Sequence, residues 1–373
     1  MNVKVSRPSI DESDRAAVLE ALAASEISGT SGTFIPRFER EFAEYCGCAQ
    51  GVATANGTVA LHLAFAALGI GPGDEVLVST FTNMASVFAI LYTGATPVPV
   101  DIESDTWNID PMQIGKKITP RTKAIEVVHV YGHPADMDPI LAVAKKHHLF
   151  VVEDAAEAHG AEYRGKRVGS FGDIACFSFY ANKIITTGEG GMVVTNDGSL
   201  AARARSLKSL AYGTEQRFMH TAVGFNYRMT NLQAALGTSQ LKRIEAVIAQ
   251  KREIAEFYRN RLQGIEGLQL PVEKPYAKNV YWMYHVVLHG RLAGRRAAVR
   301  QALTERGVET REAFVPANMQ RIFIEKGIVR EDDCPVANEV GRNGFYLPSG
   351  PTLAAEELEY VVAALGEAAA GAR

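Results

Sequence analysis

Short apolar runs alternate with helix-like segments between residues 50 and 195. Runs rich in β-branched and other apolar residues favour strands, and seven of them occur here, at 51–56, 75–80, 96–102, 123–131, 149–155, 174–180 and 190–196. Apolar positions at helical spacing follow the first, second and fourth runs, at 57–68, 83–92 and 137–147. Strands that alternate with helices are typical of a wound α/β sheet with many parallel strands.

The second part of the chain has a different pattern. Residues 227–265 carry apolar positions at helical spacing, weakened only at Gly237, which predicts one or two long helices that lead to a second domain. Beyond them we expect a strand at 281–290 and helices at 295–306 and 353–369. This pattern predicts a large α/β domain over residues 1–250 and a smaller α+β domain over residues 251–373. No linker rich in Pro, Gly or Ser marks the boundary.

Composition narrows the classes of protein. The 373 residues carry a formal charge of −3, and no basic run follows the pattern that binds a phosphate backbone, so nucleic acid is not an expected partner. The N-terminal segment lacks the pattern of a secretion signal, and carboxylates interrupt every apolar run well before the roughly 20 residues that a membrane span needs. We therefore expect a cytoplasmic protein without a membrane span.

The four cysteines do not indicate a metal site. Cys46 and Cys48 are separated by one residue, which is not the spacing of a zinc site, and no second ligand pair follows. We expect reduced thiols and no bound metal.

Two residues with candidate chemistry follow apolar strands. Asp154 ends the run at 149–155, and the carboxyl ends of strands face the ligand crevice in open α/β sheets, although an Asp there also serves as a helix N-cap. Lys183 lies between an apolar strand and a glycine-rich stretch at 188–191. Apolar neighbours such as Ile184 would desolvate this lysine, and desolvation makes an amine a usable nucleophile.

A third feature precedes both. Gly57 and Thr58 begin a predicted helix directly after the first strand, and the N–H groups of a helix N-terminus form an anion site. An anion site, a strand-end carboxylate and a loop lysine, in that order on an α/β sheet, are what pyridoxal phosphate requires. The anion site would anchor the phosphate, Lys183 would form an imine with the cofactor, and Asp154 would keep the ring nitrogen protonated.

The surrounding motifs resemble the nucleotide-sugar aminotransferases, a branch of the fold-type-I pyridoxal-phosphate enzymes. The resemblance covers nearly the whole chain, and its motifs are FEREFAEYCG, NGTVALHLAFAALGIGPGDEV, EDAAEAHGA, FGDIACFSFYANKIITTGEGGM and GFNYRMTNLQAALGTSQL. It implies a mixed, mostly parallel seven-stranded sheet with a smaller α+β C-terminal domain. It also separates the chain from the dehydratases of the family, which resemble it but have a histidine at the position of Lys183.

The resemblance also implies roles for single residues. Gly57, Thr58 and Ser178 would hold the cofactor's phosphate. Asn226 would reach the phosphate from a neighbouring subunit, so the protein would be a homodimer with shared active sites. Glu157 would lie near the cofactor's phenolic oxygen.

The implied reaction is a two-step amino transfer. Glutamate would give its amino group to the cofactor, and a keto-sugar linked to a nucleotide would then receive it, with Lys183 moving the proton as general base and acid. Motifs at 128–140 and 182–197 resemble those of enzymes that aminate GDP-4-keto-6-deoxymannose at C4. Such amino sugars serve the O-antigen of lipopolysaccharide.

The acceptor half of the site is less determined. The family has an aromatic residue that stacks on the cofactor where this chain has Asn83, so Phe81 is an alternative source of the stack. Asn318 stands where the enzymes that this chain resembles have a histidine in the substrate pocket. His159 and Arg311 are further candidates for binding substrate.

Several alternatives remain open. The acceptor could be a different keto-sugar nucleotide or a small phosphorylated ketone, and the fold could also serve a non-catalytic binding protein. A dehydrogenase is disfavoured, because no G-x-G-x-x-G turn follows the first strand. Trp107 and Trp282 are expected to be packing residues, although Trp282 could border a nucleotide.

Overall fold

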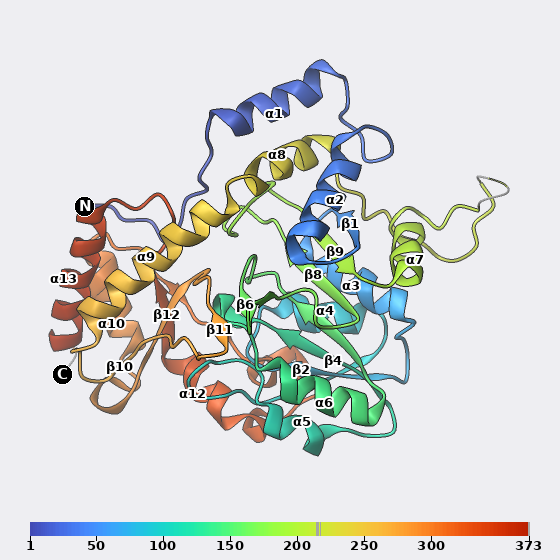
Figure 1. Cartoon of the computed structure of the whole chain (residues 1–373). Helices are drawn as coiled ribbons and strands as arrows, with labels where there is room; N and C mark the ends of the chain where they lie inside the picture. Colours follow the sequence, from blue (N-terminus) through green and yellow to red (C-terminus); the bar gives the residue numbers. More distant parts are fainter. Residues whose placement is uncertain (214–215, 217, 372–373) are drawn as a thin grey trace.

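The predicted seven-stranded, mostly parallel sheet is confirmed (Figure 1). In order across the sheet its strands are β1 (Gln50–Thr54), β9 (Gly191–Thr195), β8 (Ile174–Ser178), β5 (Phe150–Asp154), β4 (Thr122–Val128), β2 (Glu75–Ser79) and β3 (Thr96–Val100). Only β9 runs antiparallel to its neighbours, and the other adjacent pairs are parallel. This computed structural model describes residues 1–213, 216 and 218–371.

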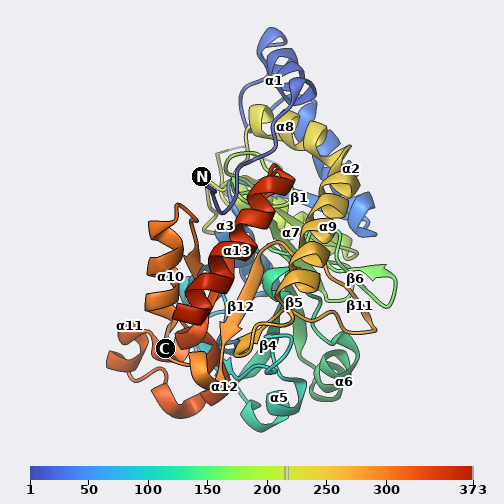
Figure 2. The same cartoon turned by 90° about the vertical axis from the view of Figure 1, so that its left-hand side faces the viewer.

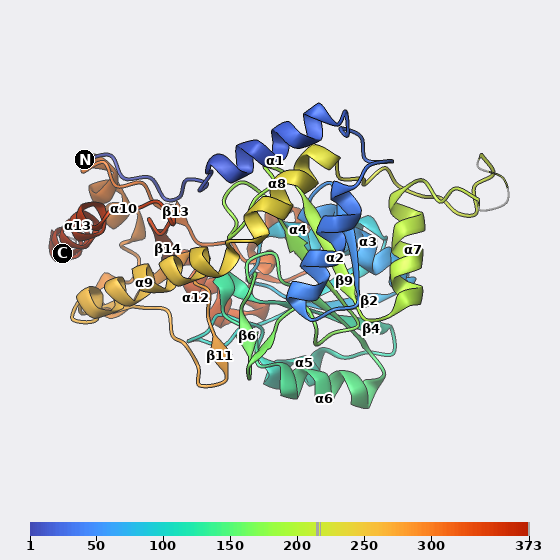
Figure 3. The same ribbon diagram turned by 45° about the horizontal axis from the view of Figure 1, so that its top comes forward.

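Helices cover both faces of this sheet. One face carries α3 (Gly57–Leu68), α4 (Met84–Tyr92) and α7 (Gly198–Lys208), and the other carries α2 (Phe34–Cys46), α5 (Pro111–Lys117) and α6 (Met137–His147). Leu61, Ile90 and Val76 belong to one buried apolar cluster on the first face, and Ile114 and Ile125 belong to another on the second. Figure 3 shows α5 and α6 side by side below the strands. Because both faces are covered, consecutive residues of most strands are buried instead of alternating with exposed ones.

Local signals place the helix that begins the site. Asn56 caps α3, because its side-chain oxygen accepts a hydrogen bond from the Val59 N–H at 3.0 Å. Gly69 ends the helix with a φ of 81°, a left-handed conformation that glycine adopts without strain. The predicted helices at 57–68 and 137–147 are confirmed to the residue.

The long apolar segment at 227–265 forms two helices, α8 (Asn231–Leu241) and α9 (Ile244–Leu262). Thr230 and Gln233 form a capping box at the start of α8. The first helix, α1 (Glu12–Ala23), lies along α8 at the edge of the molecule (Figures 1 and 3), where Gln240 donates a hydrogen bond to Asp14 at 2.6 Å.

The C-terminal part contains a four-stranded antiparallel sheet. Its order is β10 (Leu268–Gln269), β12 (Tyr284–Leu288), β14 (Gly344–Leu347) and β13 (Arg311–Glu312). Its core is shared with α9, α10 (Arg296–Glu305) and α13 (Ala355–Gly371), and two shorter helices, α11 (Arg321–Glu325) and α12 (Pro335–Asn343), complete this part. A small third sheet joins β11 (Ala277–Lys278) to β6 (Glu162–Tyr163) and β7 (Lys166–Arg167).

The first residues of the chain pack on this C-terminal part, on the side of α10 and α13 (Figure 2). Val3 forms a parallel bridge with Val308, and the Ser349 N–H donates to the Val5 carbonyl at 3.0 Å. Backbone pairing between such distant segments leaves no local pattern in the sequence. The boundary near residue 250 stays a prediction, and α9 runs through it.

Within the described ranges, none of the helices combines the length and apolar character that crossing a membrane requires.

Candidate active site

A cavity of about 540 Å³ opens at the carboxyl edge of the large sheet. Ligand sites of open α/β sheets lie at this edge, and their volumes are about 300–1,000 Å³. Asp154 ends β5, Ser178 ends β8, and Gly57 begins α3. The cavity is lined by seven of the predicted site residues, namely Gly57, Thr58, Asn83, Asp154, Glu157, Ser178 and Lys183.

Lys183 reaches this cavity from the loop between β8 and β9. The loop is anchored by Phe179 and Ile185, which are buried, and by the hydrogen bond from the Thr187 N–H to the Phe179 carbonyl at 3.0 Å. Lys183 Nζ lies 4.0 Å from Glu157 Oε1. Burial lowers the pKa of the Lys183 amine below its ordinary value, and the nearby carboxylates of Glu157 and Asp154 oppose that shift. The amine therefore has the desolvated environment that the sequence predicted.

Asp154 points from the end of β5 into the same space. Its carboxylate accepts hydrogen bonds from Ser86 Oγ at 2.8 Å and from the Ala156 N–H at 3.1 Å. Ser86 in turn shares a hydrogen bond of 2.9 Å with Thr82. Burial raises the pKa of Asp154, and the two hydrogen bonds oppose the increase. A cation in the cavity would therefore stabilise the ionised carboxylate.

Glu157 lies on the turn that follows β5. Its Oε2 atom accepts a hydrogen bond from the Tyr131 N–H at 2.8 Å. Tyr131 has a φ of 53°, a left-handed conformation that is uncommon for an aromatic residue, so the turn that presents this N–H is strained. Burial raises the pKa of Glu157 to about 7, against the effect of the Lys183 charge. Burial therefore favours the protonated form of this carboxyl group, whereas the Lys183 ammonium favours the ionised form.

The N-terminus of α3 forms a further wall of the cavity. The N–H groups of Gly57 and Thr58 donate no hydrogen bond to any residue in the described ranges, and the helix dipole makes this end positive. A Cβ atom at Gly57 would lie 2.7 Å from Cβ of Ser178, so only glycine lets the helix start this close to the end of β8. These donors can receive an anion such as a phosphate group.

Asn83 lines the cavity but also caps α4, because its side-chain oxygen accepts from the Ala85 N–H at 3.0 Å. Phe81 is not the alternative stacking residue. Its ring is fully buried beside Tyr131 and Phe314, and it does not line the cavity.

The C-terminal part supplies three of the aromatic side chains of the cavity, and Tyr92 and Tyr180 line it from the part with the large sheet. Trp282, Phe314 and Tyr346 line it, and the Trp282 ring lies over Lys183, with Nζ 3.6 Å from the ring centroid. Trp282 therefore packs, as expected, and also lines the cavity. The YWMY stretch is the one signal for this placement in the sequence, and no local pattern indicates Phe314 or Tyr346.

His159 does not line the cavity. Its ring is fully buried among Phe42, Phe177 and Phe179, and burial lowers its pKa to about 3. The prediction that it binds substrate is wrong, because these three aromatic rings surround it.

Asn318 is also enclosed. Its Oδ1 accepts from Thr80 Oγ1 at 2.7 Å, and its Nδ2 donates to Asn338 Oδ1 at 2.8 Å and to the Glu331 carbonyl at 2.7 Å. The side chain is fully buried and outside the cavity. Asn318 therefore holds its own loop in place, and the prediction of a substrate contact is wrong.

Arg311 and Asn226 also lie outside the cavity, and both are exposed. Arg311 forms an ion pair with Glu309 at 2.7 Å on the surface of the C-terminal part, so the structure does not bring it to the other site residues. Asn226 lies on the segment between α7 and α8, where it bridges to Ser209.

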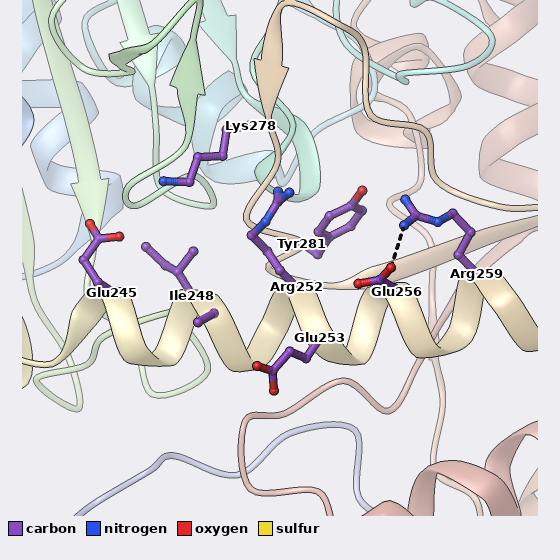
Figure 4. A pocket seen from close by; sticks show the side chains of 9 residues that line it. Glu245, Ile248, Arg252, Glu253, Glu256, Arg259, Lys278 and Tyr281 are labelled. Atoms are coloured by element: carbon purple, nitrogen blue, oxygen red, sulfur yellow. Dashed lines mark ion pairs between the residues drawn. The ribbon is translucent and has the colours of Figure 1, made fainter.

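A second hollow, of about 350 Å³, follows α9 and contains none of the predicted site residues (Figure 4). Glu256 pairs with Arg259 at 3.7 Å, and Arg252 pairs with Glu273 at 2.5 Å. The six charged residues that line this hollow are three carboxylates and three cations, so the hollow has no net preference for an anion or a cation. The cavity with Lys183 is therefore the candidate active site.

Comparison with known proteins gives a consistent result. Residues 8–366 match the model of the DegT/DnrJ/EryC1/StrS aminotransferase family. The chain is 44% identical over 369 residues to GDP-perosamine synthase of Caulobacter vibrioides, and the alignment covers 98% of each chain. It is 40% identical over 338 residues to dTDP-3-amino-3,4,6-trideoxy-alpha-D-glucose transaminase of Streptomyces venezuelae, which covers 90% of this chain and 87% of the relative.

Two solved structures are close in fold. The S. venezuelae DesV structure in complex with a ketimine intermediate has a TM-score of 0.89 at 39% identity and covers 95% of this chain and 94% of the other. A putative sugar aminotransferase from Streptococcus pneumoniae in its PLP form has a TM-score of 0.95 at 25% identity and covers 100% of both chains.

Proposed function

Because the chain belongs to the DegT/DnrJ/EryC1/StrS aminotransferase family, we propose that it moves the amino group of glutamate to C4 of GDP-4-keto-6-deoxymannose, with pyridoxal phosphate as cofactor. Membership of the family makes it a sugar aminotransferase. The product would be GDP-perosamine. The observation that carries the proposal is the cavity that joins Lys183, Asp154 and the N-terminus of α3, in a chain 44% identical to a GDP-perosamine synthase.

The residues of the cavity fit the cofactor. The free N–H groups of Gly57 and Thr58 suit its phosphate, with the hydroxyl of Ser178 beside them. The buried Asp154 carboxylate has no ion pair with any described residue, and a protonated pyridine ring would supply the missing cation. Lys183 has the buried amine that would attach the cofactor.

Pyridoxal phosphate supplies an electron-accepting ring and a carbon that carries the amino group between donor and acceptor. The chain would supply the rest. Lys183 Nζ would hold the proton taken from the donor's carbon and return it, and Asp154 would keep its carboxylate opposite the ring nitrogen. Glu157, whose pKa burial raises, would accept or donate a hydrogen bond beside that amine.

We also propose a homodimer in which Asn226 completes the neighbouring site. Asn226 is exposed and lies outside the cavity of its own chain, which supports this role. The described part of the segment between α7 and α8, which carries Asn226, extends away from the large sheet (Figure 1). It exposes apolar side chains, and the exposed fractions of Met219 and Val223 are 61% and 88%. A second copy would bury these side chains.

A panel of keto-sugar nucleotides tests the substrate. The purified protein is incubated with pyridoxal phosphate, glutamate and either GDP-4-keto-6-deoxymannose, dTDP-linked keto-sugars or small phosphorylated ketones, and products are identified by mass spectrometry. We expect GDP-perosamine from the first. Amination of a dTDP-sugar alone would overturn the GDP assignment but keep the family activity, and amination of a phosphorylated ketone alone would exclude a nucleotide sugar. Cofactor binding with no product from any acceptor would favour a binding protein.

A further inference from the structure

The amine of Lys183 has an unusual set of neighbours. Nζ lies over the Trp282 ring at 3.6 Å from the centroid and 4.0 Å from Glu157 Oε1. It makes no hydrogen bond to any residue in the described part of the chain. The face of an indole ring is electron-rich and attracts an ammonium group, most strongly where water is scarce. The ring is therefore the closest group that stabilises this amine in its protonated form.

The Trp282 ring is fixed in that position. Its Nε1–H donates to the Asn182 carbonyl at 2.8 Å, and Asn182 is the residue immediately before Lys183. Tyr131 stacks on the ring with an interplanar angle of 23°. The whole residue is only 4% exposed. One side chain thus contacts both the amine of Lys183 and the backbone that carries it.

Lys251 holds the backbone of Trp282. It lies on α9, is 4% exposed, and donates a hydrogen bond from Nζ to the Trp282 carbonyl at 2.8 Å. It also donates to the Ser349 carbonyl and lies 3.4 Å from Ser349 Oγ. No described carboxylate pairs with it, and burial lowers its pKa to about 7. Its three donors therefore connect α9, the Trp282 segment and the loop after β14.

From this arrangement we propose that Trp282 is a positioning residue that holds the Lys183 amine whenever the amine is free, and that Lys251 keeps Trp282 in place. The inference rests on the proposed function of Lys183. Whenever Lys183 is not bonded to the cofactor, its amine would stay over the indole ring, which would keep it in one place for the proton transfer.

The proposal has a consequence for protonation. The ionisable groups that face Lys183 are Glu157 and Asp154, which favour the ammonium form; His159 lies outside the cavity but interacts electrostatically with Lys183, and burial lowers its pKa. Removing the indole face leaves these groups in place and removes one source of cation stabilisation. The pKa of Lys183 should then fall further below its ordinary value.

The test measures the protonation of Lys183 directly in the full chain without cofactor. Acetic anhydride labelling across about pH 6–11, read by peptide mass spectrometry, gives a midpoint for Lys183, with exposed Lys116 as the internal reference for reagent reactivity. In Trp282→Leu we expect the Lys183 midpoint to fall by about 0.4–1.5 pH units, the range of a cation–π interaction.

A fluorinated series separates this effect from a structural one. The chain has two tryptophans, so a Trp107→Phe background leaves Trp282 as its one indole. Mono-, di- and trifluorotryptophan keep the ring and its N–H but progressively remove electron density from the ring face. We expect the Lys183 midpoint to fall with each fluorine. A midpoint that is constant across the series would overturn the proposal, even if Trp282→Leu does not fold.

The role of Lys251 is tested by Lys251→Met, with exposed Lys242→Met as the matched control. Loss of the hydrogen bond to the Trp282 carbonyl should lower the Lys183 midpoint and change the emission of Trp282, while the control leaves both as in the parent. An unchanged midpoint and emission in Lys251→Met would remove Lys251 from the proposal. Because labelling needs neither cofactor nor substrate, a failed transamination assay and a failed labelling result remain distinguishable.

Discussion

Burial shifts three ionisable side chains in the cavity toward their uncharged forms. It lowers the pKa of Lys183 and raises the pKa values of Asp154 and Glu157. A bound cofactor would partly reverse the shift of Asp154, since a protonated ring nitrogen would stabilise its carboxylate. Within the described ranges, the buried Asp154 carboxylate therefore lacks a cationic partner until a ligand supplies one.

Asp154→Asn tests this at one residue. Asparagine keeps the size and the acceptor for the Ser86 hydroxyl, but it cannot stabilise a protonated ring nitrogen. We expect kcat to fall by about 100–1,000-fold, the usual effect of removing one preorganised electrostatic group, while the cofactor still binds. The measurement is turnover with glutamate alongside the absorbance of the bound cofactor. Turnover equal to the parent would contradict the role of Asp154 at the ring nitrogen.

At the scale of elements, the site depends on how closely α3 approaches β8. The helix begins at Gly57, whose backbone lies against Ser178 at the end of the strand, so the free N–H groups and the hydroxyl face the same point. The same edge receives Asp154 from β5 and Asn83 from the start of α4. Parallel strands bring their carboxyl ends together, and this is why residues 57, 83, 154 and 178 meet.

Gly57→Ala is the corresponding test, with Gly198→Ala as its control. Both glycines are the first residue of a helix, but a Cβ at Gly57 would lie 2.7 Å from Ser178 Cβ, whereas a Cβ at Gly198 meets nothing within 4 Å. Overpacking costs about 1–3 kcal/mol, so we expect Gly57→Ala to weaken pyridoxal phosphate binding by about tenfold or more. Gly198→Ala should bind like the parent. Equal affinities in an absorbance titration would show that the α3 terminus does not hold the cofactor.

At the scale of the whole molecule, the C-terminal part contributes side chains to the cavity. Trp282, Phe314 and Tyr346 of this part line the cavity together with Tyr92 and Tyr180 from the part with the large sheet. Histidines are also buried in the interior of the protein. His159 and His285 are fully buried, and burial lowers the pKa of each to about 3. Because the unfolded chain binds protons at these residues near pH 6.5 and the folded protein does not, the free energy of unfolding should decrease as pH falls below that value.

His159→Leu measures this contribution. Between pH 7 and pH 5 the unfolded chain gains most of one proton at residue 159, while the folded chain gains almost none. The variant should therefore lose about 2 kcal/mol less stability than the parent over this interval. Urea unfolding of the cofactor-free protein at both pH values gives the comparison. His147→Leu, at an exposed position of α6, should keep the parent's pH dependence, and the same dependence in His159→Leu would contradict the prediction.

The elements themselves were largely predictable. The helices at 57–68 and 137–147, the seven strands and the paired helices within 227–265 follow from periodicity and caps, which are properties of neighbouring residues. Gly57, Asp154 and Lys183 were predictable for the same reason, because a helix start, a strand end and a glycine-rich loop leave local patterns. Their meeting in one cavity then follows from the parallel sheet.

The failures share a different cause. Asn318 and His159 are polar residues in suggestive positions, yet their partners come from distant segments: Thr80 and Asn338 for the amide, Phe42 and Phe177 for the imidazole. Whether a polar side chain faces a ligand or the protein depends on such contacts, which no local pattern records.

The sequence by itself therefore determined the sheet, the helices and the residues that could carry the chemistry, because short-range backbone preferences and motif order decide them. Only the tertiary structure decided what surrounds the amine of Lys183. The Trp282 ring reaches it across about a hundred residues of chain, and Lys251 holds that ring from α9. Contacts of this kind depend on how the C-terminal part packs on the sheet, and that packing is a property of the whole molecule.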